Sequence, residues 1–170
     1  MAKGIIIGFI LALGCLALGA YIYLSLGLVP VATAAEPMPF ETYLAKRGLK
    51  AVVHKASGLH SPLDAAEPNL LIGATLYRNN CAVCHGLPGQ ETTSIAAGMF
   101  PKPPQLLHGK GVTDDPVGET FWLVQNGIRL TGMPGFKASM SETQMWQVSQ
   151  LLAQADKLPE GVRAELLRKD

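Results

Sequence analysis

The longest apolar run in the chain extends from Gly4 to Val29 and contains no charged side chain. About 20 apolar helical residues cross a bilayer core about 30 Å thick, so the run predicts one transmembrane helix within residues 1–29. Lys3 precedes the run, and Glu36 is the first charged residue after it. A basic residue on the near side favours an N-terminus inside the cell and all later residues outside.

The same segment allows two forms of processing. The small residues from Ala32 to Ala35 resemble a signal-peptidase site, and cleavage there would release everything downstream. Because the apolar part of a signal peptide usually has about 7–15 residues, the length of this run favours a retained anchor. Acylation of Cys15 in a lipoprotein is disfavoured by the poor lipobox at residues 12–14, so we expect Cys15 to be a small apolar helix residue.

Residues 30–68 change to a mixture of Pro, Ala, Gly and charged residues, which is typical of a linker. Within it, the segment from Phe40 to Lys55 interleaves apolar residues with Lys46, Arg47 and Lys50. This pattern predicts a short amphipathic basic helix, which either lies on a membrane surface or packs on the following domain. The sequence leaves both interpretations open.

Beyond the linker, apolar residues recur at helical spacing, and no strand pattern surrounds them. The pattern predicts helices over Pro68–Asn80 and Asp115–Asn126. It also predicts a last core helix that begins after Ser141, with Gln144 as the partner of Ser141 in a capping box. The tail, residues 160–170, is expected to form a short exposed helix. The fold class is therefore all-α.

With 170 residues, the chain has room for one ordinary domain besides the apolar segment. Its 14 basic and 13 acidic residues leave a net charge of +1, which excludes the strong basic field that nucleic-acid binding usually requires. Three cysteines are too few for a disulfide-stapled scaffold. The positive mean hydropathy of +0.23 comes from the N-terminal run. We therefore expect a small globular domain with no nucleic-acid partner.

The sequence Cys81-Ala82-Val83-Cys84-His85 matches C-x-x-C-H, the attachment motif of a c-type haem. Two cysteines on one helical turn can add to the two vinyl groups of one haem, and the adjacent histidine then lies under the iron as its proximal ligand. A structural zinc site needs four ligands, and a thioredoxin-type pair needs a βαβ context; neither surrounds this motif. We therefore predict one covalently attached haem c with its iron.

Attachment of haem through thioethers takes place on the outer side of the bacterial cytoplasmic membrane. This agrees with the outward orientation that Lys3 and Glu36 indicate. We therefore expect a single-pass protein of the inner membrane with its haem domain on the periplasmic side.

Residues 69–159 resemble a monohaem class I cytochrome c of the membrane-anchored bacterial type. Gly73, Tyr77 and Cys81 follow one another at intervals of four, like the first helix of that family, where the glycine allows close contact with the C-terminal helix. Leu151 stands where the family commonly has tyrosine, so we expect an aliphatic contact with the first helix. The resemblance implies a small helical fold around one haem, preceded by a single transmembrane helix and followed by the tail from residue 160.

The segment Pro103-Pro104-Gln105-Leu106 resembles the Pro-x-Leu segment of the family. In the family, the proline carbonyl accepts a hydrogen bond from the proximal histidine, and the leucine contacts the haem. The resemblance implies these roles for Pro104 and Leu106, with Pro103 as the alternative to Pro104. Such an acceptor fixes the orientation and basicity of the imidazole.

The glycine-rich stretch from Asn126 to Phe136 resembles the methionine loop of the family and implies that Met133 is the sixth ligand of the iron. Glycine and proline make such a loop rigid and let its backbone approach the haem. The rival ligands are Met99, Met140 and, for a bis-histidine site, His108. Met99 is disfavoured because the family has no distal ligand before the Pro-x-Leu segment, and Met140 because it lies past the loop.

Histidine and methionine together saturate the iron and favour a high reduction potential. The resemblance therefore implies a one-electron carrier, not an enzyme, that passes electrons between donors and acceptors of the respiratory chain at the periplasmic face. One alternative is a fixed haem c subunit of a larger membrane oxidoreductase, whose anchor packs on other helices. Another is a five-coordinate haem sensor or peroxidase-like protein, which requires that Met133 does not bind the iron.

Overall fold

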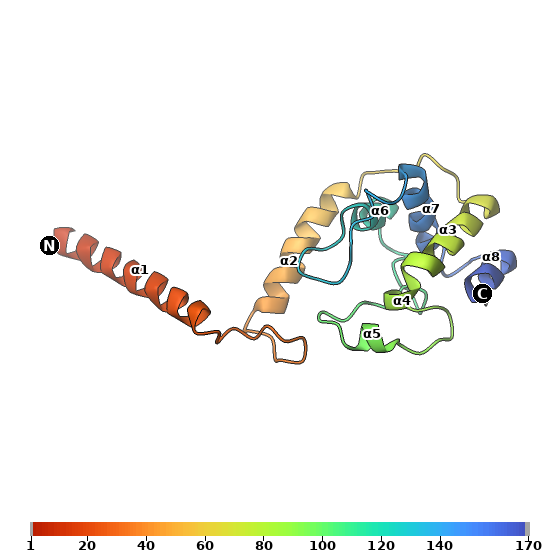
Figure 1. The fold of residues 1–170 in the computed structure, drawn as a ribbon. Helices are drawn as coiled ribbons and strands as arrows, with labels where there is room; N and C mark the ends of the chain where they lie inside the picture. Colours follow the sequence, from red (N-terminus) through yellow and green to blue (C-terminus); the bar gives the residue numbers. More distant parts are fainter. Residues whose placement is uncertain (1, 169–170) are drawn as a thin grey trace. The chain divides into compact units, whose positions relative to one another are not determined.

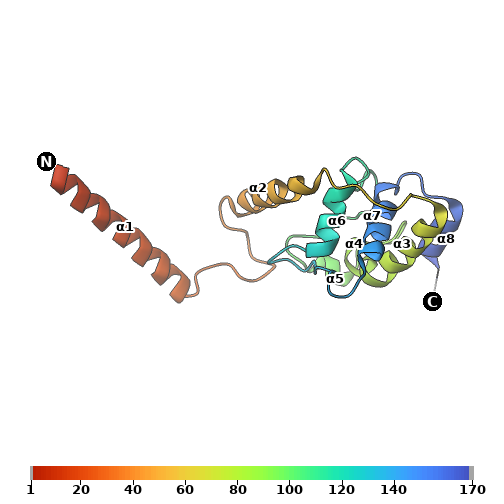
Figure 2. The same cartoon turned by 90° about the horizontal axis from the view of Figure 1, so that it is seen from above.

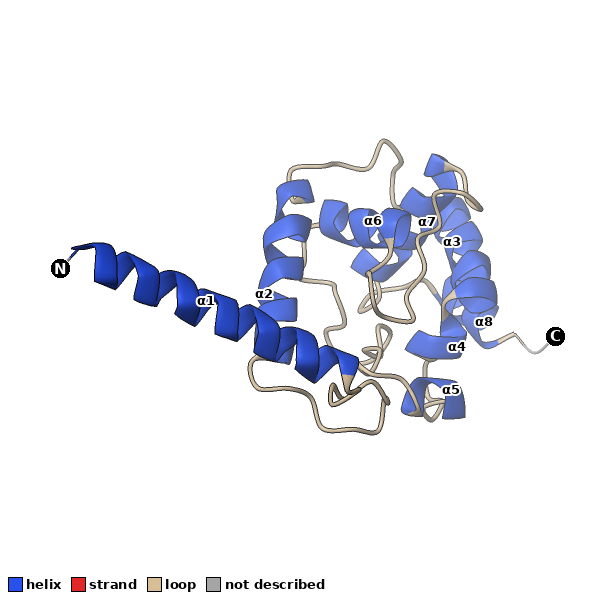
Figure 3. Cartoon of the chain, turned by 60° about the vertical axis from the view of Figure 1, so that its left-hand side comes forward, coloured by secondary structure: helices blue, strands red, loops and turns tan. Residues whose placement is uncertain are grey.

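The computed structural model describes residues 2–168, which form two compact units, one ending at Pro39 and one beginning at Phe40. Throughout these residues the secondary structure consists of helices and loops, without strands (Figure 3). The predicted all-α fold is thereby confirmed.

The first unit contains α1, a continuous helix from Ala2 to Ser25 (Figure 1). Its 24 residues span about 36 Å at about 1.5 Å per residue, which exceeds a hydrocarbon core of about 30 Å. By length and composition α1 is able to cross a membrane. The apolar sequence continues to Val29, but the helix stops earlier because Gly27 adopts a φ of 67°, which is incompatible with helical backbone.

The second unit opens with the amphipathic segment. It forms α2 from Glu41 to Val53, followed by η1, one 3-10 turn from His54 to Ala56. The side chains of Val53 and Ala56 are buried, and the Nδ1 atom of His54 lies 3.0 Å from the carboxylate of Glu119. The C-terminal end of α2 is therefore fastened to the rest of the second unit.

Three longer helices build the core of the second unit, where the sequence pattern places them. They are α3 from Glu67 to Asn80, α6 from Val117 to Asn126 and α7 from Glu142 to Ala153. Two single-turn helices, α4 (Ala82–His85) and α5 (Ser94–Ala97), separate α3 from α6 in the sequence. The α7 helix packs against both α3 and α6 (Figure 2).

The α3 and α7 helices approach most closely at Gly73. A side chain at this position would meet the carbonyl carbon of Gln147 at 2.9 Å and the Cβ atom of Leu151 at 3.2 Å. Leu151 is fully buried here, so the expected aliphatic contact with the first helix is confirmed. One turn further along α3, the buried hydroxyl of Tyr77 donates a hydrogen bond to the Gly86 carbonyl at 2.9 Å. This bond ties α3 to the chain just after the C-x-x-C-H motif.

The N-terminus of α7 has the capping box that the sequence predicts. The Ser141 hydroxyl accepts a hydrogen bond from the Gln144 N–H at 3.2 Å, and the Gln144 side chain accepts one from the Ser141 N–H at 2.8 Å. Further along, Trp146 stacks on Phe121 of α6 with ring centroids 3.9 Å apart. Both aromatic side chains are buried, so they act as core residues between the two helices.

The C-terminal tail forms a short helix, as the sequence predicts. The prediction that this helix is exposed was wrong. Glu160–Leu167 form α8, which packs against α3 (Figure 1). Val162 and Leu166 are fully buried there. Because these residues are four positions apart, they lie on one face of the helix, and this face closes the core on the side of α3.

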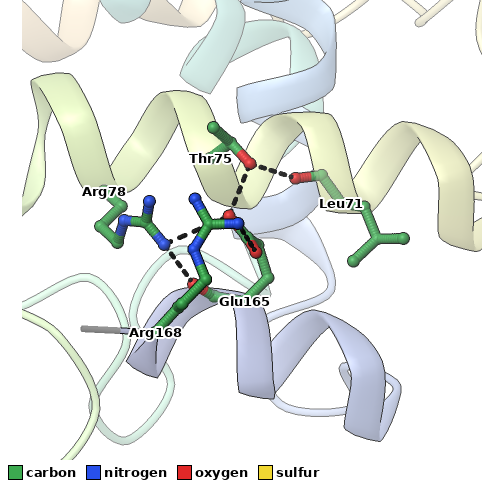
Figure 4. A network of polar contacts seen from close by, with 5 residues as sticks. All are labelled: Leu71, Thr75, Arg78, Glu165 and Arg168. Carbon is green, nitrogen blue, oxygen red and sulfur yellow. Dashed lines mark hydrogen bonds and ion pairs between the residues drawn. The ribbon is translucent and has the colours of Figure 1, made fainter. Parts of the chain in front are cut away.

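A polar network also fastens α8 to α3 (Figure 4). The Nη1 atom of Arg78 donates to the backbone carbonyl of Glu165 at 2.9 Å and lies 3.2 Å from its carboxylate. The Thr75 hydroxyl donates to the same carboxylate at 2.8 Å, and Arg168 pairs with its other oxygen at 3.1 Å. The Arg78 side chain is only 8% exposed, so water screens this ion pair little.

Candidate functional site

The second unit contains a cleft lined by residues of α3, α4, α6 and α7 and of two loops. The cleft has a volume of about 210 Å³ and opens to solvent. Its walls are mostly apolar and include Leu106, Val112, Leu123, Ile128, Phe136 and Leu152.

The C-x-x-C-H motif lies on the wall of the cleft at the junction of α3 and α4. The backbone N–H groups of Cys84 and His85 both donate to the Cys81 carbonyl, at 3.1 and 2.9 Å. This single turn brings all three side chains to the cleft. The two thiols are free and do not form a disulfide. Burial, together with the neighbouring Cys84, raises the pKa of Cys81 to about 12, so its thiol is protonated at neutral pH.

The imidazole of His85 is held by the segment that resembles Pro-x-Leu. Its Nδ1 atom donates a hydrogen bond to the Pro104 carbonyl at 2.8 Å, while Pro103 only lines the cleft. A proton on Nδ1 leaves the lone pair of Nε2 available to a metal. Burial lowers the pKa of His85 below its usual value, although the bond to Pro104 opposes this effect. The imidazole is therefore neutral at pH 7, as a metal ligand must be.

The loop after α6 brings Met133 to the cleft. The first loop residue, Gly127, has a φ of 65°, and a side chain there would meet the Met133 carbonyl oxygen at 2.7 Å. The N–H of Ile128 donates to that carbonyl at 3.1 Å, and the hydroxyl of Thr131 accepts a hydrogen bond from the Met133 N–H at 3.1 Å. These bonds close the loop on itself, so the backbone that carries Met133 is fixed.

Met99 also lines the cleft, although its position in the sequence counted against it. The methyl group of Met99 occupies the space that a side chain at Gly132 would fill. Met99 therefore contacts the loop directly beside Met133. The sequence offered one signal for this contact, the glycine at position 132, whose missing side chain makes room for a neighbour.

The other sequence candidates are distributed as follows. Leu106 is half-buried and lines the cleft, whereas Met140 is buried in the core and His108 is exposed on a loop, and neither lines it. Lys102 lines the cleft and was not singled out by sequence analysis. It is the one lysine or arginine among the described lining residues, and a cation there suits the acidic groups of a cofactor.

These residues fit a covalently attached haem c. The cleft combines two free thiols, an imidazole with an available Nε2 atom and methionine sulfur within apolar walls. Cys81 and Cys84 would attach the group, and His85 would bind its iron. When bound, haem c supplies an iron centre that takes up and gives back one electron. The chain itself would attach that group within apolar walls, and the Pro104 carbonyl orients the imidazole of His85.

Comparison with known families agrees with this geometry. Residues 68–152 match the family described as "Cytochrome C oxidase, cbb3-type, subunit III". The matched segment is half of the chain and contains the motif at residues 81–85, Pro104 and Met133. A search of curated proteins gave no match. The chain therefore belongs to the cbb3-type cytochrome c oxidase subunit III family, as a class I cytochrome c with covalently bound haem c and a role in electron transfer.

Proposed function

We propose that the protein is a membrane-anchored one-electron carrier whose haem iron is bound by His85 and Met133. The observation that carries the proposal is that both side chains line one apolar cleft, each on a fixed segment. The Pro104 carbonyl holds His85 by its Nδ1 atom, and internal hydrogen bonds hold the loop of Met133. Two axial ligands leave no coordination position open to oxygen or a substrate, which favours electron transfer over catalysis.

The proposed location is the periplasmic face of the inner membrane. The apolar helix α1 supports the anchor, and Lys3 before it supports an inside N-terminus. Thioether attachment of haem outside the cytoplasmic membrane supports the same side for the haem domain. An anchored carrier stays at a high local concentration near membrane-bound electron donors and acceptors.

The mouth of the cleft offers an apolar surface for such partners. Leu130 lies between Ile128 and Thr131, which both line the cleft, and its side chain is 94% exposed. Its φ of 60° is rare for a residue other than glycine, and strained backbone of this kind is concentrated at functional sites. Transient contacts between redox proteins are small, so Leu130 would contact a partner that docks over the cleft.

The first experiment is an absorption spectrum of the haem-loaded full chain in detergent, in ferric and ferrous forms and with carbon monoxide. We expect a low-spin ferrous c-type spectrum that carbon monoxide does not change. The weak red band of methionine sulfur on ferric iron should be present, absent in Met133→Ala and kept in the core control Met140→Leu. A high-spin form that binds carbon monoxide would contradict the proposal and favour a sensor or peroxidase-like site.

Met99→Leu separates the two methionines of the cleft. Retention of the red band in this variant is expected, because the family resemblance assigns the sulfur ligand to Met133. Loss of the band in Met99→Leu, with its retention in Met133→Ala, would transfer the ligand role to Met99.

A second candidate function is a fixed subunit of a larger membrane oxidoreductase. The observation that favours it is the family match, since that family is named for a subunit of cytochrome c oxidase. Extraction of native membranes in mild detergent distinguishes the two. A free carrier elutes as a single chain in its detergent micelle, without other polypeptides, whereas a fixed subunit elutes in a stable assembly with them.

A further inference from the structure

The N-terminal half of α2 carries an apolar surface that the second unit does not cover. Phe40, Tyr43 and Leu44 are 75, 60 and 63% exposed, although burial in a core would stabilise side chains of this kind. Val52, further along the helix, is 43% exposed. Phe40, which directly precedes the helix, Tyr43 and Leu44 form the apolar patch at the start of α2, whereas Val52 lies nine residues after Tyr43 on the opposite face.

The same helix carries a cluster of basic residues. Lys46, Arg47 and Lys50 are exposed, and Glu41 is the only acidic residue of the helix. Lys50 lies close enough to Asp115 to oppose the rise in the pKa of that carboxyl, so part of its charge faces the domain. Lys46 and Arg47 stand one turn earlier, on the half of the helix next to Leu44, and form the basic pair of α2.

The C-terminal end of the helix is fixed to the domain, in contrast to its N-terminal half. Val53 and Ala56 are buried, and His54 contacts Glu119 at 3.0 Å. Gly118 of α6 has no side chain where η1 passes, and a Cβ atom there would come within 2.6 Å of the Leu59 carbonyl oxygen. The helix is therefore a rigid extension of the haem domain with one free, amphipathic end.

The chain leads directly from α1 to this free end. Residues 26–40 separate Ser25, the last residue of α1, from Glu41, the first residue of α2. At no more than about 3.6 Å per residue, this segment spans at most about 54 Å. An anchor in the membrane therefore keeps the free end of α2 within reach of the lipid surface.

We propose that the N-terminal half of α2 docks on an anionic phospholipid surface, with Phe40, Tyr43 and Leu44 entering the interface and Lys46 and Arg47 contacting lipid phosphates. This inference rests on the proposed anchoring by α1. Exposed apolar residues beside lysine and arginine on one helix are the pattern of interfacial helices. The basic pair matches the negative charge of such a surface, which a neutral lipid lacks.

Docking has a consequence for the redox site. The fixed end of α2 packs on α6, and the loop that carries Met133 starts directly after Asn126, the last residue of α6. A docked α2 therefore holds the mouth of the cleft at a set angle to the membrane instead of leaving it to rotate on the linker. Membrane-bound partners would then meet the cleft in one orientation.

The experiment tests the affinity of α2 separately from the tether. The haem-loaded full chain, with a protease site inserted between Ala35 and Glu36, is reconstituted into vesicles of phosphatidylcholine or of phosphatidylcholine mixed with phosphatidylglycerol. Before cleavage the chain should sediment with both vesicles. If it does not, α1 is not an anchor, and that failure is distinct from a failure of α2. After cleavage, the absorbance of haem shows whether the released domain stays with the vesicles.

We expect the released domain to stay on the phosphatidylglycerol vesicles, to leave them at high salt and to leave pure phosphatidylcholine at once. Each basic residue near an anionic surface contributes about fivefold in affinity, so Lys46→Glu with Arg47→Glu should lower partitioning by at least about 25-fold. The matched control, Lys157→Glu with Arg163→Glu, changes net charge equally at exposed residues of another region and should leave it unchanged.

Leucine variants test the apolar part of the surface. Leu44→Ser should lower partitioning by about tenfold, whereas Leu167→Ser, at a leucine that is 50% exposed on α8, should not. Equal release from both lipids, or equal loss in the control pair, would overturn the proposal. Retention on native membranes combined with release from the phosphatidylglycerol vesicles would assign α2 to a protein partner and overturn it too.

Discussion

The α8 helix lies outside the segment that matches the family, yet its packing makes it part of the haem domain, and Leu166→Ala tests this directly. Leu166 is fully buried against α3. The substitution removes three carbon atoms from the core, which costs about 0.8 kcal/mol each by transfer, or about 2.4 kcal/mol together. A cavity that stays open raises the cost to about 3–5 kcal/mol in tightly packed cores.

We expect about 3 kcal/mol at Leu166, the lower end of that range, because α8 is a short helix of eight residues that can shift to fill part of the cavity. The measurement is guanidinium unfolding of the haem-loaded full chain in detergent, followed by the haem absorbance. The midpoint should fall while the slope with denaturant stays the same, which indicates a change in stability and not in the exposed surface.

The control is the neighbouring residue. Leu167 is 50% exposed, so Leu167→Ala should change the free energy of unfolding by less than about 0.5 kcal/mol. Both variants replace leucine by alanine in one helical turn, so differences in helix propensity cancel. Equal effects of the two substitutions would refute the packing of α8 on the domain, because an independent tail transmits neither change to the haem absorbance.

Two further predictions concern the packing of α3 against α7 and the charge of Asp115. Gly73→Ala should lower the free energy of unfolding by about 1–3 kcal/mol in the same assay, because the new methyl group meets the Gln147 carbonyl. The control is Gly48→Ala, at an open position of α2, which should raise helix stability by about 0.5–1 kcal/mol. Equal losses of stability in the two variants would contradict the close approach of α3 and α7. Burial and the carboxylates of Asp114 and Glu119 raise the pKa of Asp115, so its ionised form destabilises the fold. Asp115→Asn should therefore raise the melting temperature at pH 7 but not at pH 3, where the carboxyl is protonated whether the chain is folded or not; an equal gain at both pH values would show a cause other than charge.

Features that depend on neighbours in the sequence were predictable. The C-x-x-C-H turn needs only five residues, and the capping box of Ser141 and Gln144 needs four; both form as their spacing requires. The helical periodicity of α3, α6 and α7 is likewise local, and their observed bounds differ from the predicted ones only near the ends. The start of α6 at Val117 follows from Pro116, whose fixed φ suits the position before the first helical turn.

Features that depend on residues far apart in the sequence were not predictable. The buried face of α8 consists of Val162 and Leu166 alone, and two apolar positions among charged neighbours also describe a solvated helix. A packed helix is distinguished from a solvated one here by the contact of Glu165 with Arg78. Arg78 lies 87 residues earlier in the sequence, so the local pattern does not show this contact. The contact of Met99 with Gly132 is non-local in the same way, because the fold brings together two loops that are far apart in the sequence.

The position of Arg78 shows why a helix outside the matched segment matters to the haem site. Arg78 stands on the last turn of α3, three residues before Cys81, and its guanidinium is held by both the carboxylate and the backbone carbonyl of Glu165. On the opposite side, Gly73 lets α7 press against α3. The helix that delivers the first cysteine is thus held from two sides, and Tyr77 ties its end to the chain beyond His85. A substitution that loosens α8 should therefore disturb the C-x-x-C-H turn more than the loop that carries Met133. The reason is that α8 packs against α3 and not against the residues that close that loop.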